Sequence, residues 1–174
     1  MLVQPLVSTA AISHTGQPTG AGFDLLLLFH GACALVGIGT VVVSGTQAWR
    51  LGALPAGSET PVSIRRYYTP GFNWAARVLY GVPVFGFALL GASKGAYGLG
   101  QGWVMIGLTI WVVVIGLGEG LLWPLERRLA EAVSRSDGGE RGAEVASTSR
   151  SAWLTASGML VLLVVAMVIM FARP

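Results

Sequence analysis

Four long apolar stretches fill most of this 174-residue chain, and they constrain its fold more than any other feature of the sequence. A helix needs about 20 apolar residues to cross a hydrocarbon core roughly 30 Å thick, and each stretch is about that long. Only 11% of the residues are charged, whereas about a quarter are charged in an ordinary soluble domain. The sequence therefore predicts an all-α integral membrane four-helix bundle. The predicted spans are approximately Phe23 to Val43, Trp74 to Tyr97, Gly102 to Trp123 and Trp153 to Phe171.

The arginines cluster in two of the three connections between these stretches. Cytoplasmic connections of membrane proteins carry an excess of Lys and Arg, whereas the turn around Gly98 to Gln101 carries neither. We therefore expect both termini to face out of a bacterial plasma (inner) membrane, which the chain crosses several times. In this arrangement residues 1–22 form an exposed outer tail and residues 23–174 form the transmembrane domain. The clustered residues are Arg50, Arg65 and Arg66 in the first connection, and Arg127, Arg128, Arg135, Arg141 and Arg150 in the third.

The two basic connections differ in composition. The first, Ser44 to Asn73, contains three prolines, which predict a loop with one short helix around Val62 to Tyr68. Its run Arg65-Arg66-Tyr67-Tyr68 is either a patch for anionic lipid or a partner subunit, or an ordinary anchor at the membrane interface. The other connection is rich in Ser, Gly and charge from Ser134 to Ser149, which predicts a flexible segment unless a partner holds it.

Small residues form a stripe along the second predicted span. Its members are separated by alternating steps of four and three residues, so they share one helical face. Helices in a membrane associate largely through small residues that let their backbones approach closely. We therefore expect this stripe to face a neighbouring helix. Its members are Arg77, Gly81, Val84, Ala88, Gly91 and Gly95.

Five ionisable residues fall within the predicted spans, where charged side chains are costly and are functional candidates by default. Asp24 and Lys94 lie near the outer ends of the first and second spans, and Arg77 and Glu119 lie near the inner ends of the second and third. The matching levels predict two ion pairs. Glu119, between two glycines, is either a structural contact between helices or the proton-coupling carboxylate of a small transporter.

The fifth ionisable residue is His30, which stands alone within the first span. A neutral imidazole on a face of small residues could ligate haem b, with Lys94, Met159, Met167 or Met170 as the second ligand. The alternative is a histidine that is hydrogen-bonded across helices. No other cofactor and no metal site is expected. Clusters of His, Cys and carboxylates with metal-ligand spacing, nucleophile elbows and phosphate-binding loops are all missing from the sequence, so we do not expect an enzyme.

Three short motifs carry a resemblance to a known family. They are Phe29-His30-Gly31-Ala32 in the first span, Arg65-Arg66 before the second, and the ending Met170-Phe171-Ala172-Arg173-Pro174. Over about residues 23–174 the chain resembles a bacterial family of predicted four-helix integral membrane proteins of unknown function. That family is distantly similar to four-helix membrane proteins of copper resistance and of haem biosynthesis. In the latter a first-helix histidine ligates haem, so the resemblance points to His30 as a haem ligand.

These observations favour a non-catalytic accessory subunit of a larger bacterial plasma-membrane complex, of a respiratory or otherwise electron-transferring kind. Its partners would be membrane lipids and other integral membrane subunits, and the clustered arginines do not form a nucleic-acid footprint. Two alternatives remain open at this point: a haem-binding membrane protein that uses His30, and a small proton-coupled transporter that uses Glu119.

Overall fold

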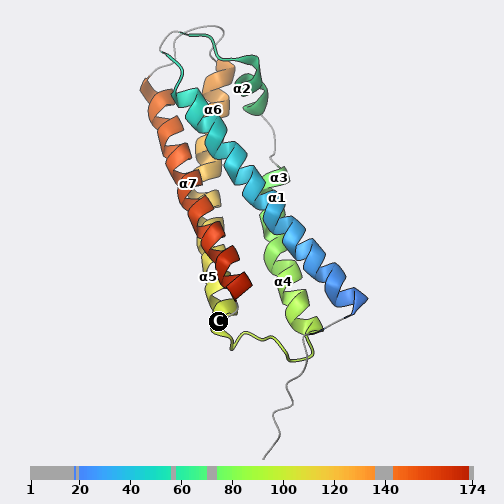
Figure 1. Cartoon of the computed structure of the whole chain (residues 1–174). Helices are drawn as coiled ribbons and strands as arrows, with labels where there is room; N and C mark the ends of the chain where they lie inside the picture. Colours follow the sequence, from blue (N-terminus) through green and yellow to red (C-terminus); the bar gives the residue numbers. More distant parts are fainter. Residues whose placement is uncertain (1–17, 19, 56–57, 70–73, 136–142, 173–174) are drawn as a thin grey trace, which may run out of the picture.

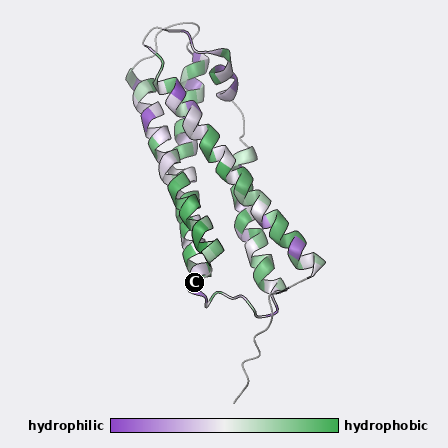
Figure 2. Ribbon diagram, in the orientation of Figure 1, coloured by the Kyte–Doolittle hydropathy of each residue, from purple (hydrophilic) through white to green (hydrophobic). Residues whose placement is uncertain are grey.

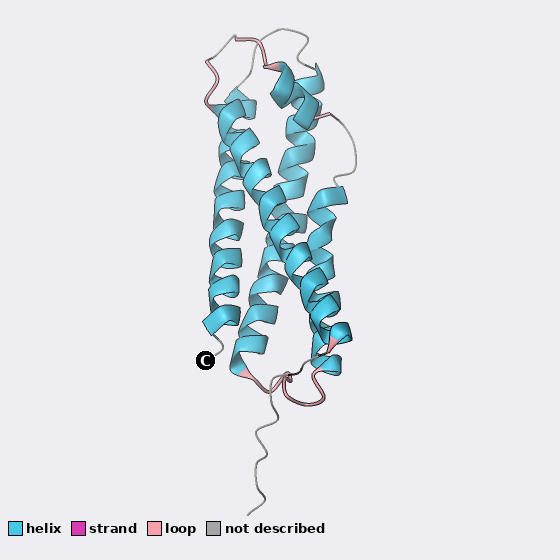
Figure 3. Ribbon diagram, turned by 45° about the vertical axis from the view of Figure 1, so that its right-hand side comes forward, coloured by secondary structure: helices cyan, strands magenta, loops and turns pink. Residues whose placement is uncertain are grey.

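The computed structural model describes residues 18, 20–55, 58–69, 74–135 and 143–172. Within these ranges the chain is helical and contains no strand (Figure 3). Four helical stretches are long and apolar enough to cross a membrane, which confirms the predicted all-α class and the number of spans. They are Ala21–Gly52, Ala75–Ala92, Gly102–Arg135 and Ala143–Ala172.

Two of the four stretches are single helices and two are interrupted (Figure 1). The first is α1 (Ala21–Gly52) and the fourth is α7 (Ala143–Ala172). The second stretch is divided into α3 (Trp74–Arg77), the 3₁₀ turn η1 (Val78–Tyr80) and α4 (Gly81–Ala92). The third is divided into α5 (Gly102–Leu117), the π-helical segment η2 (Gly118–Leu122) and α6 (Trp123–Arg135). The short helix α2 (Val62–Tyr67) lies in the first connection, where the sequence predicts one.

The helices form an open arrangement rather than a closed square. α1 packs against both α4 and α7, and α7 also packs against α5 (Figure 1). Although α4 and α5 follow each other in sequence, they are not close-packed partners. An antiparallel α4–α5 hairpin, which the short connection between them suggests, is therefore not how these helices are held.

The helices are longer at the α2 end than the sequence predicts. α1 continues nine residues beyond Val43, and α7 begins ten residues before Trp153. The predictions of a loop from Ser44 and of a flexible segment up to Ser149 are therefore wrong where these helices extend. Residues 136–142 lie outside the described residues. Almost all of the predicted outer tail, residues 1–22, also lies outside them. The physical reason is a close approach of α1 and α7 over small side chains.

Two glycines of α1 mark this approach. A Cβ atom at Gly45 would lie 3.1 Å from Cβ of Ala156, and one at Gly52 would lie 3.2 Å from Cβ of Ser149. Small residues such as Gly and Ser lower the hydropathy of a segment, yet they let two backbones pack closely and bury the atoms between them. The core accordingly extends to the α2 end, beyond the apolar middle of the bundle (Figure 2). Its fully buried larger side chains there include Leu51, Ile64 and Leu129.

Candidate functional site

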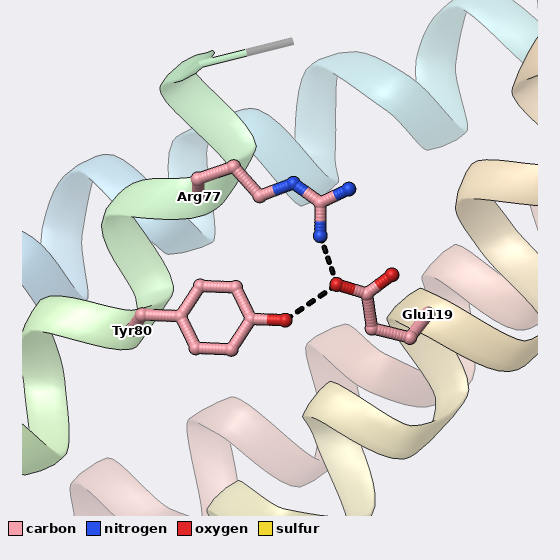
Figure 4. Close-up of polar contacts among 3 residues, drawn as sticks. All are labelled: Arg77, Tyr80 and Glu119. Atoms are coloured by element: carbon pink, nitrogen blue, oxygen red, sulfur yellow. Dashed lines mark hydrogen bonds and ion pairs between the residues drawn. The ribbon is translucent and has the colours of Figure 1, made fainter. Parts of the chain in front are cut away.

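The predicted pair of Arg77 and Glu119 is formed and belongs to a larger cluster (Figure 4). Arg77 Nη1 donates a hydrogen bond to Glu119 Oε1, and the Tyr80 hydroxyl donates to the same oxygen. The Arg77 guanidinium carbon also lies 3.8 Å from the ring centroid of Trp123, a cation–π arrangement. One carboxylate thus connects the second helical stretch to the third, at the level where α4 begins and α5 ends.

Two irregular segments bring these groups together. Arg77 and Tyr80 are three residues apart at the 3₁₀ turn η1, and a 3₁₀ turn of three residues aligns such side chains. Glu119 lies on the π-helical segment η2, where Gly118 packs against the Trp123 ring; a Cβ at Gly118 would lie 3.2 Å from it. π-helical turns often occur at functional sites. The Glu119 side chain is 46% exposed, so the cluster lies at the surface of the bundle.

The predicted pair of Asp24 and Lys94 is wrong. Both side chains are exposed, and the described residues contain no ion pair between them. The reason is that α4 ends at Ala92, five residues before the predicted end of the span at Tyr97. Lys94 lies in the following turn with a φ of 51°, and water or headgroups can solvate each charge separately there.

A tryptophan of α5 compensates for a proline in α4. Pro83 has no N–H, so it cannot donate the helical hydrogen bond to the carbonyl of Leu79, four residues earlier. Trp111 Nε1 donates to that carbonyl at 2.9 Å. Side chains from neighbouring helices are the usual way in which membrane proteins satisfy backbone groups freed by proline. This contact fixes α5 to the start of α4, in addition to the Glu119 cluster.

His30 contacts α4 through a backbone atom. Its Nδ1 lies 2.8 Å from the carbonyl oxygen of Val82. The imidazole packs on Gly86, where a Cβ would lie 3.4 Å from His30 Cε1. His30 also lines a partly open apolar cavity of about 70 Å³, whose walls come mainly from α1, α4, α5 and α7. The other residues that line this cavity are Val82, Pro83, Gly86, Phe87, Leu90, Leu99, Val104, Gly107, Leu108, Trp111 and Met170.

The residues and size of the cavity bear on the haem hypothesis. Of the four possible second ligands, only Met170 lines it; Met159 is fully buried in the core, and Lys94 and Met167 are exposed. The pair of His30 and Met170 therefore suits an iron ligand set. The space suits haem less well, because about 70 Å³ is several times smaller than the roughly 300–1,000 Å³ of pockets for drug-sized ligands. A haem macrocycle would extend far beyond this cavity, and haem binding stays a prediction.

The run Arg65-Arg66-Tyr67-Tyr68 is divided between surface and core. Arg65 and Arg66 are exposed, whereas Tyr68 is only 3% exposed and Tyr67 is half-buried. The four residues therefore do not form one exposed patch, and the tyrosines are not available to lipid or to a partner. The arginines alone remain candidates for such a contact.

The tyrosines surround a carboxylate that sequence reasoning passed over. The hydroxyls of Tyr67 and Ser44 donate to Oε1 of Glu126 at 2.7 and 2.6 Å, so α6 is connected to both α2 and α1. Burial, and then the nearby Glu126 carboxylate, raise the pKa of Tyr67 and of Tyr68 above that of a free tyrosine. Glu126 gives no signal in the sequence beyond its place among helix-forming residues. Pro83 does give one, because it identifies the carbonyl that needs a donor.

The described ranges contain no group of three or more His, Cys, Asp or Glu that could hold a metal ion. Comparisons with known proteins give no match: no family model, no curated protein and no solved structure is similar to this chain. The resemblance drawn from the short motifs therefore remains a prediction, and functional inference has to start from the geometry of the chain.

Proposed function

We propose that this chain is a non-catalytic accessory subunit of a larger complex in the bacterial plasma membrane. The α2 end would lie in the cytoplasm, because the basic connections are at this end. The observation that carries the proposal is a helix face that the described residues of the chain leave uncovered. The complex would be of a respiratory or otherwise electron-transferring kind.

The uncovered face lies on α4, which packs mainly against α1 and has no buried residue. The small-residue stripe is covered only at its α3 end, where Arg77 binds Glu119 and Gly81 packs against Cys33. Farther along, Val84 is 64% exposed, Ala88 and Gly91 are exposed, and a Cβ at Gly91 would meet no atom within 4 Å. The expectation that the whole stripe faces another helix of this chain is therefore wrong beyond Gly81.

A face of Val84, Ala88 and Gly91 suits a helix from another subunit. Apolar side chains gain little by leaving lipid for protein, so large residues serve a lipid-facing surface equally well. Small residues give an advantage where a second backbone approaches closely. In the proposed complex, a transmembrane helix of a partner subunit packs along these three residues, which we call the α4 face.

The two alternative functions have weaker support. For haem, His30 and Met170 line one cavity, but its volume of about 70 Å³ is much smaller than the macrocycle needs. A proton-coupling carboxylate must exchange partners, whereas Glu119 already accepts hydrogen bonds from Arg77 and Tyr80. These contacts support a structural role for Glu119.

The test compares one bulky substitution at two exposed alanines. Ala88 lies on the α4 face, and Ala32 is exposed on α1, away from it. Ala88→Trp should remove the chain from the assembly that co-purifies with it in mild detergent, because the indole blocks close helix approach. Ala32→Trp should leave the assembly intact.

A cross-linking measurement gives an independent outcome. With Cys33 replaced by alanine, a cysteine at Ala88 should cross-link to another membrane protein in cells, and a cysteine at Ala32 should not. If both tryptophan variants keep the same native mass as the unmodified chain, and neither cysteine cross-links, the accessory-subunit proposal is wrong.

A further inference from the structure

We propose that the cavity beside His30 is a binding site for an uncharged, lipid-soluble molecule whose hydroxyl group donates a hydrogen bond to His30 Nε2. This inference rests on the proposed insertion in a membrane but not on any partner subunit. The best match is the ring hydroxyl of an isoprenoid hydroquinone, and a long-chain alcohol carries the same chemistry.

The imidazole of His30 carries its hydrogen on Nδ1. A backbone carbonyl only accepts hydrogen bonds, so the contact of Nδ1 with the Val82 oxygen places the ring hydrogen on Nδ1. In a neutral imidazole, Nε2 is then an acceptor. The described part of the chain provides no hydrogen-bond donor to Nε2, since the Nδ1 contact is the one hydrogen bond that His30 forms there.

The other residues that line the cavity are mostly apolar. Apart from His30, its walls are apolar except for the indole N–H of Trp111, which is already bonded to Leu79. Nε2 of the half-buried His30 is thus an acceptor in largely apolar surroundings, where an unpaired polar group costs free energy. The cavity therefore suits a ligand that is mainly apolar and brings one donor.

The depth of His30 in the membrane limits which molecules can supply the hydroxyl group. His30 is nine residues from the start of α1, which corresponds to about 14 Å along the helix axis. Phospholipid headgroups stay at the interface, so a donor at this depth belongs to a molecule without a charged headgroup. The cavity of about 70 Å³ is also smaller than the roughly 150 Å³ that holds a benzene ring. The hydroxyl end would therefore enter the cavity, and the ring and tail would extend out of its open side.

The experiment uses the full chain in lipid nanodiscs with ¹⁵N-labelled histidine. The chain has two histidines, so His14→Gln leaves His30 as the single imidazole. An isoprenoid hydroquinone should move the Nε2 resonance and leave Nδ1 in place, because the Val82 contact persists. Its dimethyl ether has the same shape but no donor, and it should bind about fivefold more weakly, the factor typical of one neutral hydrogen bond.

Two variants on α5 test the location. Val104 lines the cavity, whereas Val112 is exposed on the outside of the same helix. Val104→Phe should abolish the hydroquinone-induced shift, and Val112→Phe should preserve it. An unchanged Nδ1 resonance in both variants shows that the bundle is folded.

The outcomes separate the possible sources of the hydroxyl. A shift with the hydroquinone alone supports a quinol, and an equal shift with a long-chain alcohol supports the alcohol. An Nε2 resonance that stays fixed with both ligands, or an ether that binds as tightly as the hydroquinone, overturns the proposal. Because no partner is present in the nanodisc, none of these results depends on the accessory-subunit proposal.

Discussion

Replacing Trp111 by phenylalanine removes the side-chain donor to the Leu79 carbonyl, and a second substitution shows whether Pro83 is the reason that this donor is needed. Measured side-chain hydrogen bonds between membrane helices average about 0.6 kcal/mol and reach about 1.7. A backbone acceptor left without its partner can cost about 1–3 kcal/mol. The Trp111 contact is short, at 2.9 Å, and half-buried. We therefore expect Trp111→Phe to lower the free energy of unfolding by about 1–2 kcal/mol.

The same change should cost less when residue 83 has its own N–H. In Pro83→Ala the new amide lies four residues after Leu79 and can form the regular helical bond to its carbonyl. Adding Trp111→Phe to that variant should then cost about 0.5–1.5 kcal/mol less than in the unmodified chain, which gives a positive coupling energy in the double-mutant cycle.

Reversible unfolding in mixed micelles, followed by circular dichroism, measures all four corners of this cycle. Trp103→Phe is the matched control, because Trp103 packs edge-to-face on Tyr97 near the Ser93–Gln101 turn, away from Leu79 and Pro83. If the free-energy effects of Trp111→Phe and Pro83→Ala add to within about 0.3–0.5 kcal/mol, the idea that Trp111 compensates for Pro83 is wrong.

Three further predictions concern the Arg77–Glu119 pair, Tyr67 and the membrane topology. Arg77→Ala and Glu119→Ala should each lower the melting temperature in detergent, and the double variant should be milder than their sum; strict additivity would mean that the two side chains do not interact. Because the pKa of Tyr67 is raised in the folded chain, its contribution to stability should be constant below about pH 10 and fall above it, where the unfolded chain releases this proton first. Absorbance titration should show tyrosines that ionise late, and Tyr67→Phe should remove one of them. In a cysteine-free background, a cysteine at Ser58 should be shielded from an impermeant thiol reagent in intact cells and one at Thr15 should react, so labelling of Ser58 from outside would exclude the proposed topology.

The spans and the inner ion pair could be predicted because both depend on properties that the sequence displays directly. Length and apolarity identify a helix that can cross a membrane, and the ends of the helices fix the level of Arg77 and Glu119. The same reasoning fails for Asp24 and Lys94, because the level of Lys94 depends on where α4 ends. A change in backbone direction after Ala92 moves its side chain out of the helix, and hydropathy does not report such a change.

Contacts between helices were harder to predict, since periodicity shows which residues share a face but not which helix they meet. The spacing of the small-residue stripe places it on one face, yet Val84 and Ala88 of this face are exposed. Similarly, the composition of Ser134 to Ser149 gave no indication that Ser149 would be buried where α7 meets α1. Side chains this small support either a close-packed helix or a flexible loop, and the choice depends on a partner surface elsewhere in the sequence.

The partner site and the ligand site lie on different sides of α4, which makes the two proposals separable. Successive residues of a helix are about 100° apart, so Val84, Ala88 and Gly91 occupy one side, and the cavity residues Gly86 and Leu90 lie on roughly the opposite side. Ala88→Trp should therefore release the partner while the hydroquinone still shifts the His30 resonance. Val104→Phe should block the ligand while the assembly stays intact. If Ala88→Trp also abolished the ligand-induced shift without disturbing the Nδ1 resonance, the α4 face would not be independent of the cavity, and a single site shared by ligand and partner would replace the two.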